Sequence, residues 1–149
     1  MQVNVVRVEA QPTAVVRFEA TRAELPRLIQ AACGETWNFA KTAPGLKPGR
    51  HVAVYLKCLT DIECGVEVAG PFEGNGRVVP SSTPAGLAAT ATHIGPYHLL
   101  AGVHEAITRW CAANGHKLAG PSWEVYGHGD VDPAKFRIDV YYLLAEPAE

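Results

Sequence analysis

The sequence lacks the excess of basic residues that a nucleic-acid-binding surface needs. Lysine and arginine together number 13, against 15 acidic residues, and the formal net charge is −2. Proteins that bind a duplex gather positive charge on one face, because each contact to a phosphate releases a bound counterion. The basic residues here are scattered along the chain. We therefore expect no direct binding to nucleic acid.

Long apolar segments are also missing. A helix that crosses a bilayer needs about 20 consecutive apolar residues, and no segment of this sequence approaches that length. Its beginning carries Arg7 and Glu9, where a secretory signal peptide would have an apolar core. These absences predict a protein that makes no contact with membranes and stays in the cytoplasm.

The sequence contains no residue spacing typical of a metal or redox centre. No Cys-x-x-Cys pair is present, and no two histidines stand four residues apart on an expected helix. Structural zinc sites and thiol–disulfide motifs use such pairs. We therefore expect no metal and no cofactor. We also expect reduced, mostly buried thiols at the four cysteines, Cys33, Cys58, Cys64 and Cys111.

What is present is the composition of one globular domain. The 149 residues are 48% hydrophobic and 19% charged, which is enough to bury a core without disulfides or metals. We expect a single stand-alone domain over residues 1–149, with halves at about 1–80 and 81–149.

The first half predicts strands around one helix. Thr21, with Glu24 three residues later, forms a capping box, and Leu25, Leu28 and Ile29 recur at helical spacing. Gly34 leaves two alternatives for this helix, which either continues to about residue 41 or breaks near that glycine. Valine-rich or alternating segments predict strands at 3–9, 14–19, 51–58, 62–68 and 76–79.

The second half repeats that plan. A strand of small residues at 85–93 leads to a turn at Gly95-Pro96, and His93 is expected to hydrogen-bond this turn. Pro96 suits the first helical position, and Asn114-Gly115 suits a helix end. Further strands are expected at 122–127 and 137–144, with a polar loop through Gly129-Asp130 between them.

The two halves align residue by residue. His51–Tyr55 matches Ser122–Tyr126, which makes Tyr55 and Tyr126 equivalent and places Ala53 where the second half has Glu124. The pattern predicts an α+β fold, a tandem βαββ repeat with pseudo-twofold symmetry. In this arrangement one antiparallel sheet carries two helices packed on one face. Alternation places Trp123 and Val125 on the face opposite Glu124, where we expect the helices to cover them.

Several short motifs of the second half resemble the GyrI-like small-molecule-binding family, which includes the effector-binding halves of multidrug-responsive bacterial transcription regulators. The motifs cover about the last 60 residues. They are His93-Ile94-Gly95-Pro96-Tyr97, Ala106-Ile107, Trp110, Asn114-Gly115, Gly120-Pro121 and Trp123-Glu124-Val125-Tyr126. The resemblance implies the SOUL/GyrI-type tandem βαββ fold and a central pocket lined by aromatic residues. It also implies that Glu124 faces the ligand, with Tyr126 beside it.

Further ring-bearing residues are candidates for the same pocket. Tyr55 joins Glu124 and Tyr126 by the repeat, and Tyr97 and Tyr141 are added as aromatic residues at the helix start and on the last strand. A poorly hydrated carboxylate among rings favours a lipophilic cation, through charge attraction and cation–π contacts. The alternative is that Glu124 is solvated or pairs with a local arginine or lysine.

The primary hypothesis is a binding module that captures lipophilic, often cationic aromatic compounds. The second hypothesis is an enzyme built on the same scaffold. In a GyrI-like hydrolase that opens strained, cyclopropane-containing toxins, Glu124 and Tyr126 would be the catalytic pair. A third hypothesis is a protein-binding module like the gyrase inhibitor of the family. Exposed edge strands would also permit a homodimer.

Overall fold

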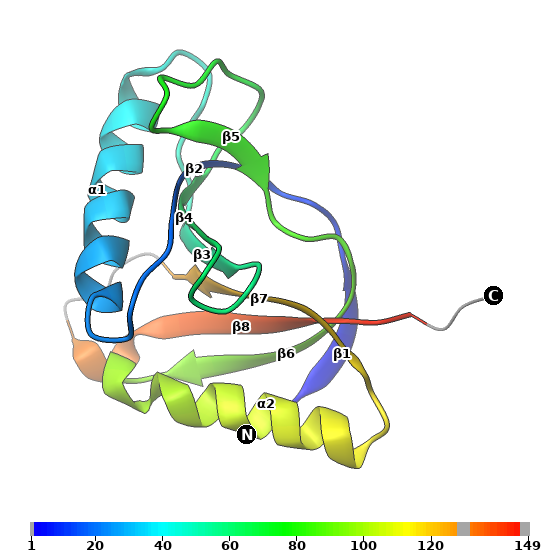
Figure 1. Cartoon of the computed structure of the whole chain (residues 1–149). Coiled ribbons are helices and arrows are strands. Elements are labelled where there is room, and N and C mark those ends of the chain that lie inside the picture. Colours follow the sequence, from blue (N-terminus) through cyan, green and yellow to red (C-terminus); the bar gives the residue numbers. More distant parts are fainter. Residues whose placement is uncertain (1, 128–131, 147–149) are drawn as a thin grey trace.

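A computed structural model describes residues 2–127 and 132–146, in which eight strands form one antiparallel sheet (Figure 1). The strands are β1 (Asn4–Val8), β2 (Pro12–Phe18), β3 (His51–Tyr55), β4 (Ile62–Glu67), β5 (Val79–Ser82), β6 (Gly86–Ile94), β7 (Leu118–Tyr126) and β8 (Arg137–Leu144). The helices are α1 (Leu25–Thr42) and α2 (Leu100–Ala113), with 3₁₀ turns η1 (Tyr97–Leu99) and η2 (Pro133–Lys135).

The sheet confirms the tandem repeat. Its strand order is β1-β6-β8-β7-β3-β4-β2-β5, so the units β2-α1-β3-β4 and β6-α2-β7-β8 meet where β3 pairs with β7. In that pair Ala53 lies opposite Glu124, and Tyr55 lies opposite Ser122. A twofold rotation about the Ala53–Glu124 position therefore exchanges Tyr55 with Tyr126, as the sequence alignment predicts.

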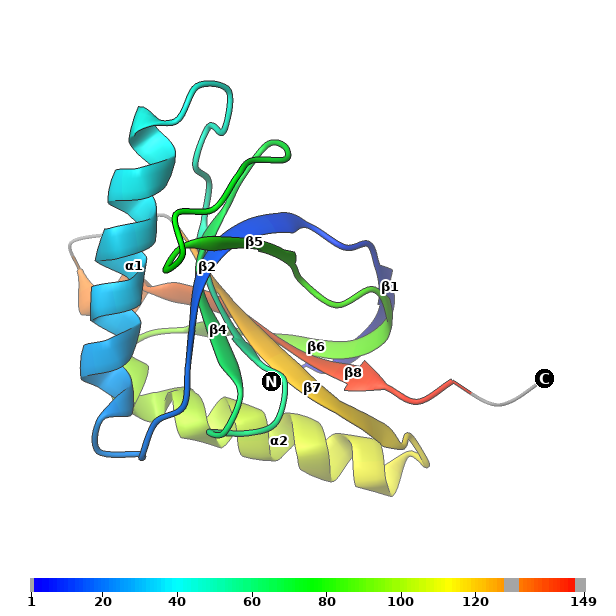
Figure 2. The same cartoon turned by 45° about the horizontal axis from the view of Figure 1, so that its top comes forward.

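Both helices lie on the same face of the sheet. Figures 1 and 2 show α1 over the first unit and α2 over the second, running in different directions. The capping box at the start of α1 is formed, because the Glu24 amide donates to Thr21 Oγ1 at 3.2 Å and the Thr21 amide donates to Glu24 Oε1 at 3.1 Å. The helix then continues without a break to Thr42.

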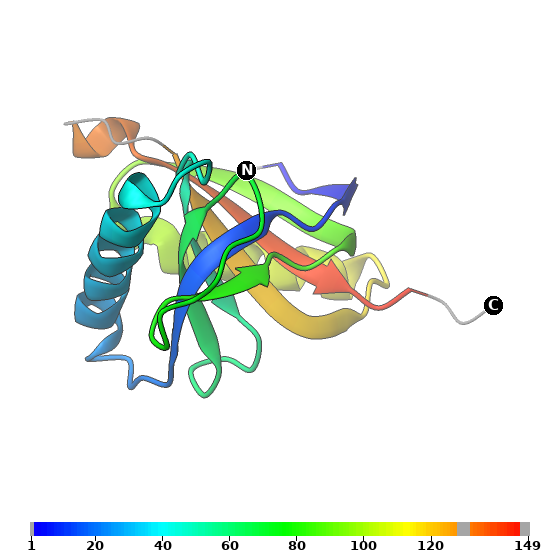
Figure 3. The same cartoon turned by 90° about the horizontal axis from the view of Figure 1, so that it is seen from above.

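The face opposite the helices is enclosed by the sheet itself. Figures 2 and 3 show the sheet curling, so that the connections from β1 to β2 and from β5 to β6 run side by side. These connections are joined by hydrogen bonds between Gln11 and Thr83. Because of this curl, residues on both faces of the central strands are buried.

The expectation that Trp123 and Val125 lie under the helices is wrong. Both pack with Val52 and Val54 on the enclosed face away from the helices. The helix-facing surface instead has small residues such as Ala53 and Ala89, which allow α1 and α2 to approach the sheet closely. Glu124 therefore points toward the helices.

Several element boundaries also differ from the sequence expectation. The last strand of the first half, β5, is Val79–Ser82 rather than 76–79, and β7 begins at Leu118, earlier than expected. Pro96 precedes the 3₁₀ turn with an extended backbone, and α2 begins only at Leu100. The hydrogen bond predicted for His93 is confirmed, since its Nε2 lies 2.9 Å from the Pro96 carbonyl oxygen. The expected loop at Gly129-Asp130 lies outside the described residues.

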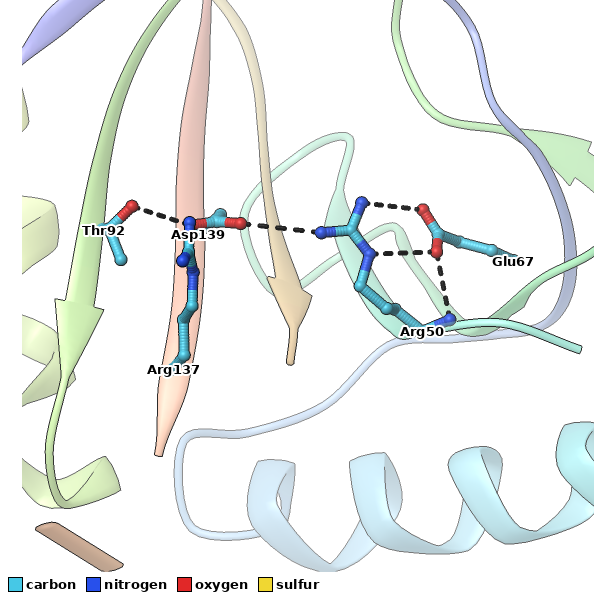
Figure 4. A network of polar contacts seen from close by, with 5 residues as sticks. All are labelled: Arg50, Glu67, Thr92, Arg137 and Asp139. Atoms are coloured by element: carbon cyan, nitrogen blue, oxygen red, sulfur yellow. Dashed lines mark hydrogen bonds and ion pairs between the residues drawn. The ribbon is translucent and has the colours of Figure 1, made fainter. Parts of the chain in front are cut away.

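A polar network ties the two units together at one end of the central strands (Figure 4). The Arg50 guanidinium donates to both carboxylate oxygens of Glu67, at 3.1 and 3.3 Å, and lies 3.6 Å from Asp139. Asp139 also accepts a hydrogen bond of 2.7 Å from Thr92. Because Asp139 is on β8 and Arg50 adjoins β3, this network links the second unit to the first.

Candidate functional site

The centre of the helix-facing surface carries a buried carboxylate. Glu124 lies on β7 beside the pseudo-twofold position, and only 5% of its surface is exposed. A carboxylate in such a place is costly unless hydrogen-bond donors or a cation replace the lost water. The neighbours of Glu124 therefore determine what this site can do.

Three donors from three elements surround the carboxylate. The Tyr126 hydroxyl donates to Oε1 at 2.5 Å, and the Tyr55 hydroxyl of the equivalent strand reaches the same oxygen at 3.5 Å. From α2, His104 places Nε2 2.6 Å from Oε2. The residue that pairs with this acid is therefore a histidine, approaching from the helix layer.

His104 is itself held in orientation from the sheet. Its Nδ1 lies 2.7 Å from the hydroxyl of Tyr142 on β8, and the two rings meet edge to face at 76°. Because a carboxylate oxygen accepts hydrogen bonds, Nε2 carries the hydrogen that it shares with Glu124. The Tyr142 hydroxyl then donates to Nδ1 of the neutral ring, or accepts from it once the ring is protonated. Glu124, His104 and Tyr142 are therefore linked by consecutive hydrogen bonds.

The phenols around Glu124 remain donors over a wide pH range. Burial raises the pKa of Tyr126 and of Tyr55, and the negative charge of Glu124 raises them further. The pKa of Tyr142 is raised for the same two reasons. Each hydroxyl therefore keeps its hydrogen for the carboxylate or the imidazole at any physiological pH.

A cavity of about 380 Å³ adjoins this cluster on the side of α1. Tyr126 lines it and also donates its hydroxyl to Glu124, so one ring connects the cavity with the acid. Trp37 and His51 line it as well, with ring centroids 5.7 Å apart. The volume lies within the range of pockets that hold small organic molecules.

Tyr97 lies beside Tyr126 but is not among the residues that line the cavity. Its ring meets Tyr126 edge to face at a centroid distance of 6.4 Å and packs on Phe136 at 4.8 Å. Tyr97 is 54% exposed. It is therefore placed to contact a ligand that approaches from solvent.

Tyr141 lies elsewhere. Its ring stacks on Trp123 at 5.1 Å and 8°, on the face of the sheet away from the helices. It lines a second cavity of about 240 Å³ together with Arg50 and Glu67. The structure therefore brings Glu124, Tyr126 and Tyr55 together, with Tyr97 nearby, and separates Tyr141 from them.

Sequence reasoning did not find His104 and Tyr142. His104 sits four residues after Leu100, on the apolar stripe of α2 that also contains Ile107, and this position marks it as inward-facing. Tyr142 follows Val140 at strand spacing on the helix-facing side of β8. These signals place both side chains in the interior, but they do not say which acid His104 meets.

In the part of the chain that the structure describes, no three histidine, cysteine, aspartate or glutamate side chains come together as a metal ion would require. In residues 2–127 and 132–146, neither helix has the length and apolarity to cross a bilayer.

Fold and site together define a small-molecule-binding α+β domain of the tandem βαββ type. The profile of the family described as the GyrI-like small molecule binding domain matches residues 1–144. The chain belongs to the GyrI-like family. A search of curated protein sequences finds no match.

Solved structures share the fold. The EcmrR C-terminal domain is 21% identical, with a TM-score of 0.82 and 98% of both chains covered. The protein SAV2435, solved with tetraphenylphosphonium bound, is 9% identical with a TM-score of 0.73, covering 97% of this chain and 94% of that one. A hydrolase from Listeria innocua is 10% identical with a TM-score of 0.64, covering 97% of this chain and 92% of that one.

Proposed function

We propose that this chain binds lipophilic, cationic aromatic compounds in the cavity beside Tyr126, with Glu124 as the opposite charge. The observation that carries the proposal is the buried Glu124 carboxylate, which accepts a hydrogen bond from Tyr126, a residue that also lines a cavity of about 380 Å³. The protein SAV2435, which shares the fold, holds tetraphenylphosphonium, a cation of this class.

The contacts suggest how the ligand is accommodated. His104 and Tyr126 contact the Glu124 carboxylate at 2.6 and 2.5 Å. A cation about 4 Å from the carboxylate would gain about 4 kcal/mol at an effective dielectric constant near 20. Rings such as Tyr126 and Trp37 would each add about 0.5 to 2 kcal/mol. We propose that a bound cation displaces His104 or Tyr126 from one carboxylate oxygen of Glu124.

Calorimetric titration with tetraphenylphosphonium tests this proposal. The wild-type chain is expected to bind it, and Glu124→Gln is expected to bind at least about tenfold more weakly, because the amide has no charge to offer. Glu63→Gln is the matched control, since Glu63 is equally buried but pairs with Arg17 and Ser81 on the other face of the sheet. Equal affinity in wild type and Glu124→Gln would contradict the role of the acid.

A second candidate function is hydrolysis of a strained electrophile, which the His104–Glu124 contact favours. A histidine held by a carboxylate and a tyrosine is an arrangement that can accept or return a proton. A Listeria innocua structure with this fold is called a hydrolase. Turnover of a cyclopropane-containing substrate that vanishes in both Glu124→Gln and His104→Gln would establish this function. Binding of the substrate without turnover would support the binding function instead.

Partners other than small molecules remain predictions. The edge strands β1 and β5 could pair with a second copy or a protein partner. Exposed Ile94 and Leu99 lie near Tyr97 and would suit an apolar contact. Sedimentation of the purified chain would measure the oligomeric state directly.

A further inference from the structure

A second cluster of reactive side chains lies in the wall of the same cavity, on the side of α1. Cys33 is half-buried on α1 and lines the cavity, and Cys64 lies buried beneath it on β4. Their Sγ atoms are 3.8 Å apart. His51, on β3, lines the cavity beside them.

The tautomer of His51 is fixed by the sheet. Its Nδ1 lies 3.3 Å from the carbonyl oxygen of Gly65, and because a carbonyl only accepts, Nδ1 carries a hydrogen. This leaves Nε2 as the ring nitrogen that can exchange a proton with the Cys33 thiol. The pKa of His51 is raised, chiefly by its hydrogen bond with Cys33.

The environment favours the thiolate at Cys33. The hydrogen bond from the Cys64 thiol and the contact with His51 together lower the pKa of Cys33 to about 5, although burial acts in the opposite direction. The thiolate is the nucleophilic form of cysteine. Cys64 and Cys111 show the opposite behaviour, since the pKa of each is raised. Among these three thiols, Cys33 combines an ionised sulfur with an opening to the cavity.

The cavity fits an organic molecule better than it fits a bare oxidant. Trp37 and Tyr126 supply ring surface, and Asn38 supplies a polar group, in a volume of about 380 Å³. A flat unsaturated compound that stacks on these rings would present its carbon atoms to Cys33.

We propose that Cys33 captures soft carbon electrophiles of the α,β-unsaturated carbonyl class as covalent thioethers in this cavity, with Cys64 and His51 as its positioning partners. The Cys33 Sγ forms a bond to the β-carbon, and the π electrons of the double bond move to give an enolate. Protonated His51 returns its proton to the α-carbon and becomes neutral. The addition balances without an oxidant or a leaving group.

The inference uses the cavity of the proposed function but not its carboxylate. Cys33 and Glu124 act on different ligands, a neutral electrophile and a cation. Covalent capture would therefore persist in Glu124→Gln, whereas binding of tetraphenylphosphonium would be weakened in that variant. A failure of one proposal is thus distinguishable from a failure of the other.

A competition experiment within one molecule tests the proposal. The reduced full chain receives a sub-stoichiometric amount of N-ethylmaleimide at pH 6, and peptide mass spectrometry measures the adduct at each cysteine. Cys58 is the internal reference because it is exposed on the surface. We expect Cys33 to react on the order of tenfold faster than Cys58, since its larger thiolate fraction outweighs its lower intrinsic nucleophilicity.

Variants of the two partners separate a chemical role from a structural one. His51→Gln and Cys64→Ala are expected to slow Cys33 several-fold without changing the rate at Cys58, and Cys64→Ser, which keeps a hydrogen-bond donor, is expected to restore most of the rate. Labelling of Cys33 no faster than Cys58 would overturn the proposal. So would a Cys33–Cys64 disulfide that forms in place of the adduct.

Discussion

Ala53 and Glu124 lie opposite each other in the β3–β7 pair, at the point where the two halves of the chain are related by a twofold rotation. The Ala53 side chain is fully buried, and the equivalent position in the second half carries an acid. Two carboxylates at this point would repel each other in a poorly hydrated site. The repeat therefore carries its acid in one half, and the site is asymmetric although the fold is nearly symmetric.

This asymmetry predicts the effect of Ala53→Glu. A second buried carboxylate without donors of its own should lower the free energy of unfolding by more than about 3 kcal/mol. Ala53→Ser, which adds a small polar group at the same place, should cost roughly 1 to 2 kcal/mol. Urea denaturation of the two variants measures the difference. Equal stability of both would contradict a tightly packed, uncharged position at residue 53.

The two phenols that contact Glu124 should differ in their contribution to stability. Tyr126 donates at 2.5 Å and Tyr55 at 3.5 Å, so the first hydrogen bond is much the stronger. Tyr126→Phe is expected to cost about 1.5 to 3 kcal/mol, the range for hydrogen bonds to charged groups, and Tyr55→Phe less than about 1 kcal/mol. Denaturation midpoints of both variants check this order, and the reverse order would refute it.

His104 should compete with a bound cation for the same carboxylate. Its Nε2 already occupies Glu124 Oε2, so a ligand must displace it or share the acid with it. His104→Phe is therefore expected to bind tetraphenylphosphonium several-fold more tightly than the wild type. His116→Gln is the control, because His116 stacks on Trp110. Weaker binding by His104→Phe would indicate that His104 helps to hold the ligand.

Alkaline titration should show delayed ionisation of the tyrosines. The pKa of all five tyrosines of the chain is raised, in each case chiefly by burial. A raised pKa means that the neutral phenol stabilises the folded state at neutral pH, and that this contribution is lost as the pH rises above the ordinary value of about 10. Phenolate absorbance and loss of circular dichroism are therefore expected to rise together above pH 10. Ionisation of all five tyrosines near pH 10 in a folded protein would contradict the burial of Tyr126 and Tyr55.

The pKa of Cys33 is shifted in the opposite direction, so its reactivity should change with pH over a lower range than that of an ordinary thiol. Because its pKa is lowered to about 5, the thiolate forms as the pH rises through that value, well below the usual 8.5 or so. Cys64 of β4 and His51 of β3 lower the pKa of this thiol, and the charged Arg50 lines the same cavity. The rate of maleimide addition at Cys33 should thus reach half of its plateau near pH 5. A half-maximal rate near pH 8.5 would show an ordinary thiol.

Residue patterns predicted which residues of the two halves are equivalent. The alignment of His51–Tyr55 with Ser122–Tyr126 makes Tyr55 and Tyr126 equivalent, and the observed register relates them by a twofold axis at Ala53 and Glu124. Ile62 and Ile138 are also equivalent in the structure, because each lies opposite the tyrosine of its own half. The equivalence of the two tyrosines could be predicted because the residue pattern of a strand is a local property.

The same alternation could not decide which face the helices cover. Trp123 and Glu124 point to opposite sides, and a strand buried on both faces gives no preference for either. The curl of the sheet encloses Trp123, whereas small residues such as Ala53 and Ala89 admit the helices on the side of Glu124. The face of the sheet that the helices cover therefore depends on all eight described strands together.

The sequence by itself determined the repeat, the equivalence of Tyr55 and Tyr126, and the presence of one acid at Glu124 where the first half has Ala53, because these depend on residue patterns along the chain. Only the tertiary structure decided which groups meet that acid. His104 reaches Glu124 across 20 residues, and Cys33 reaches Cys64 across 31, through the docking of α2 and α1 on the sheet. Helix docking is governed by packing between distant segments, which no local pattern encodes.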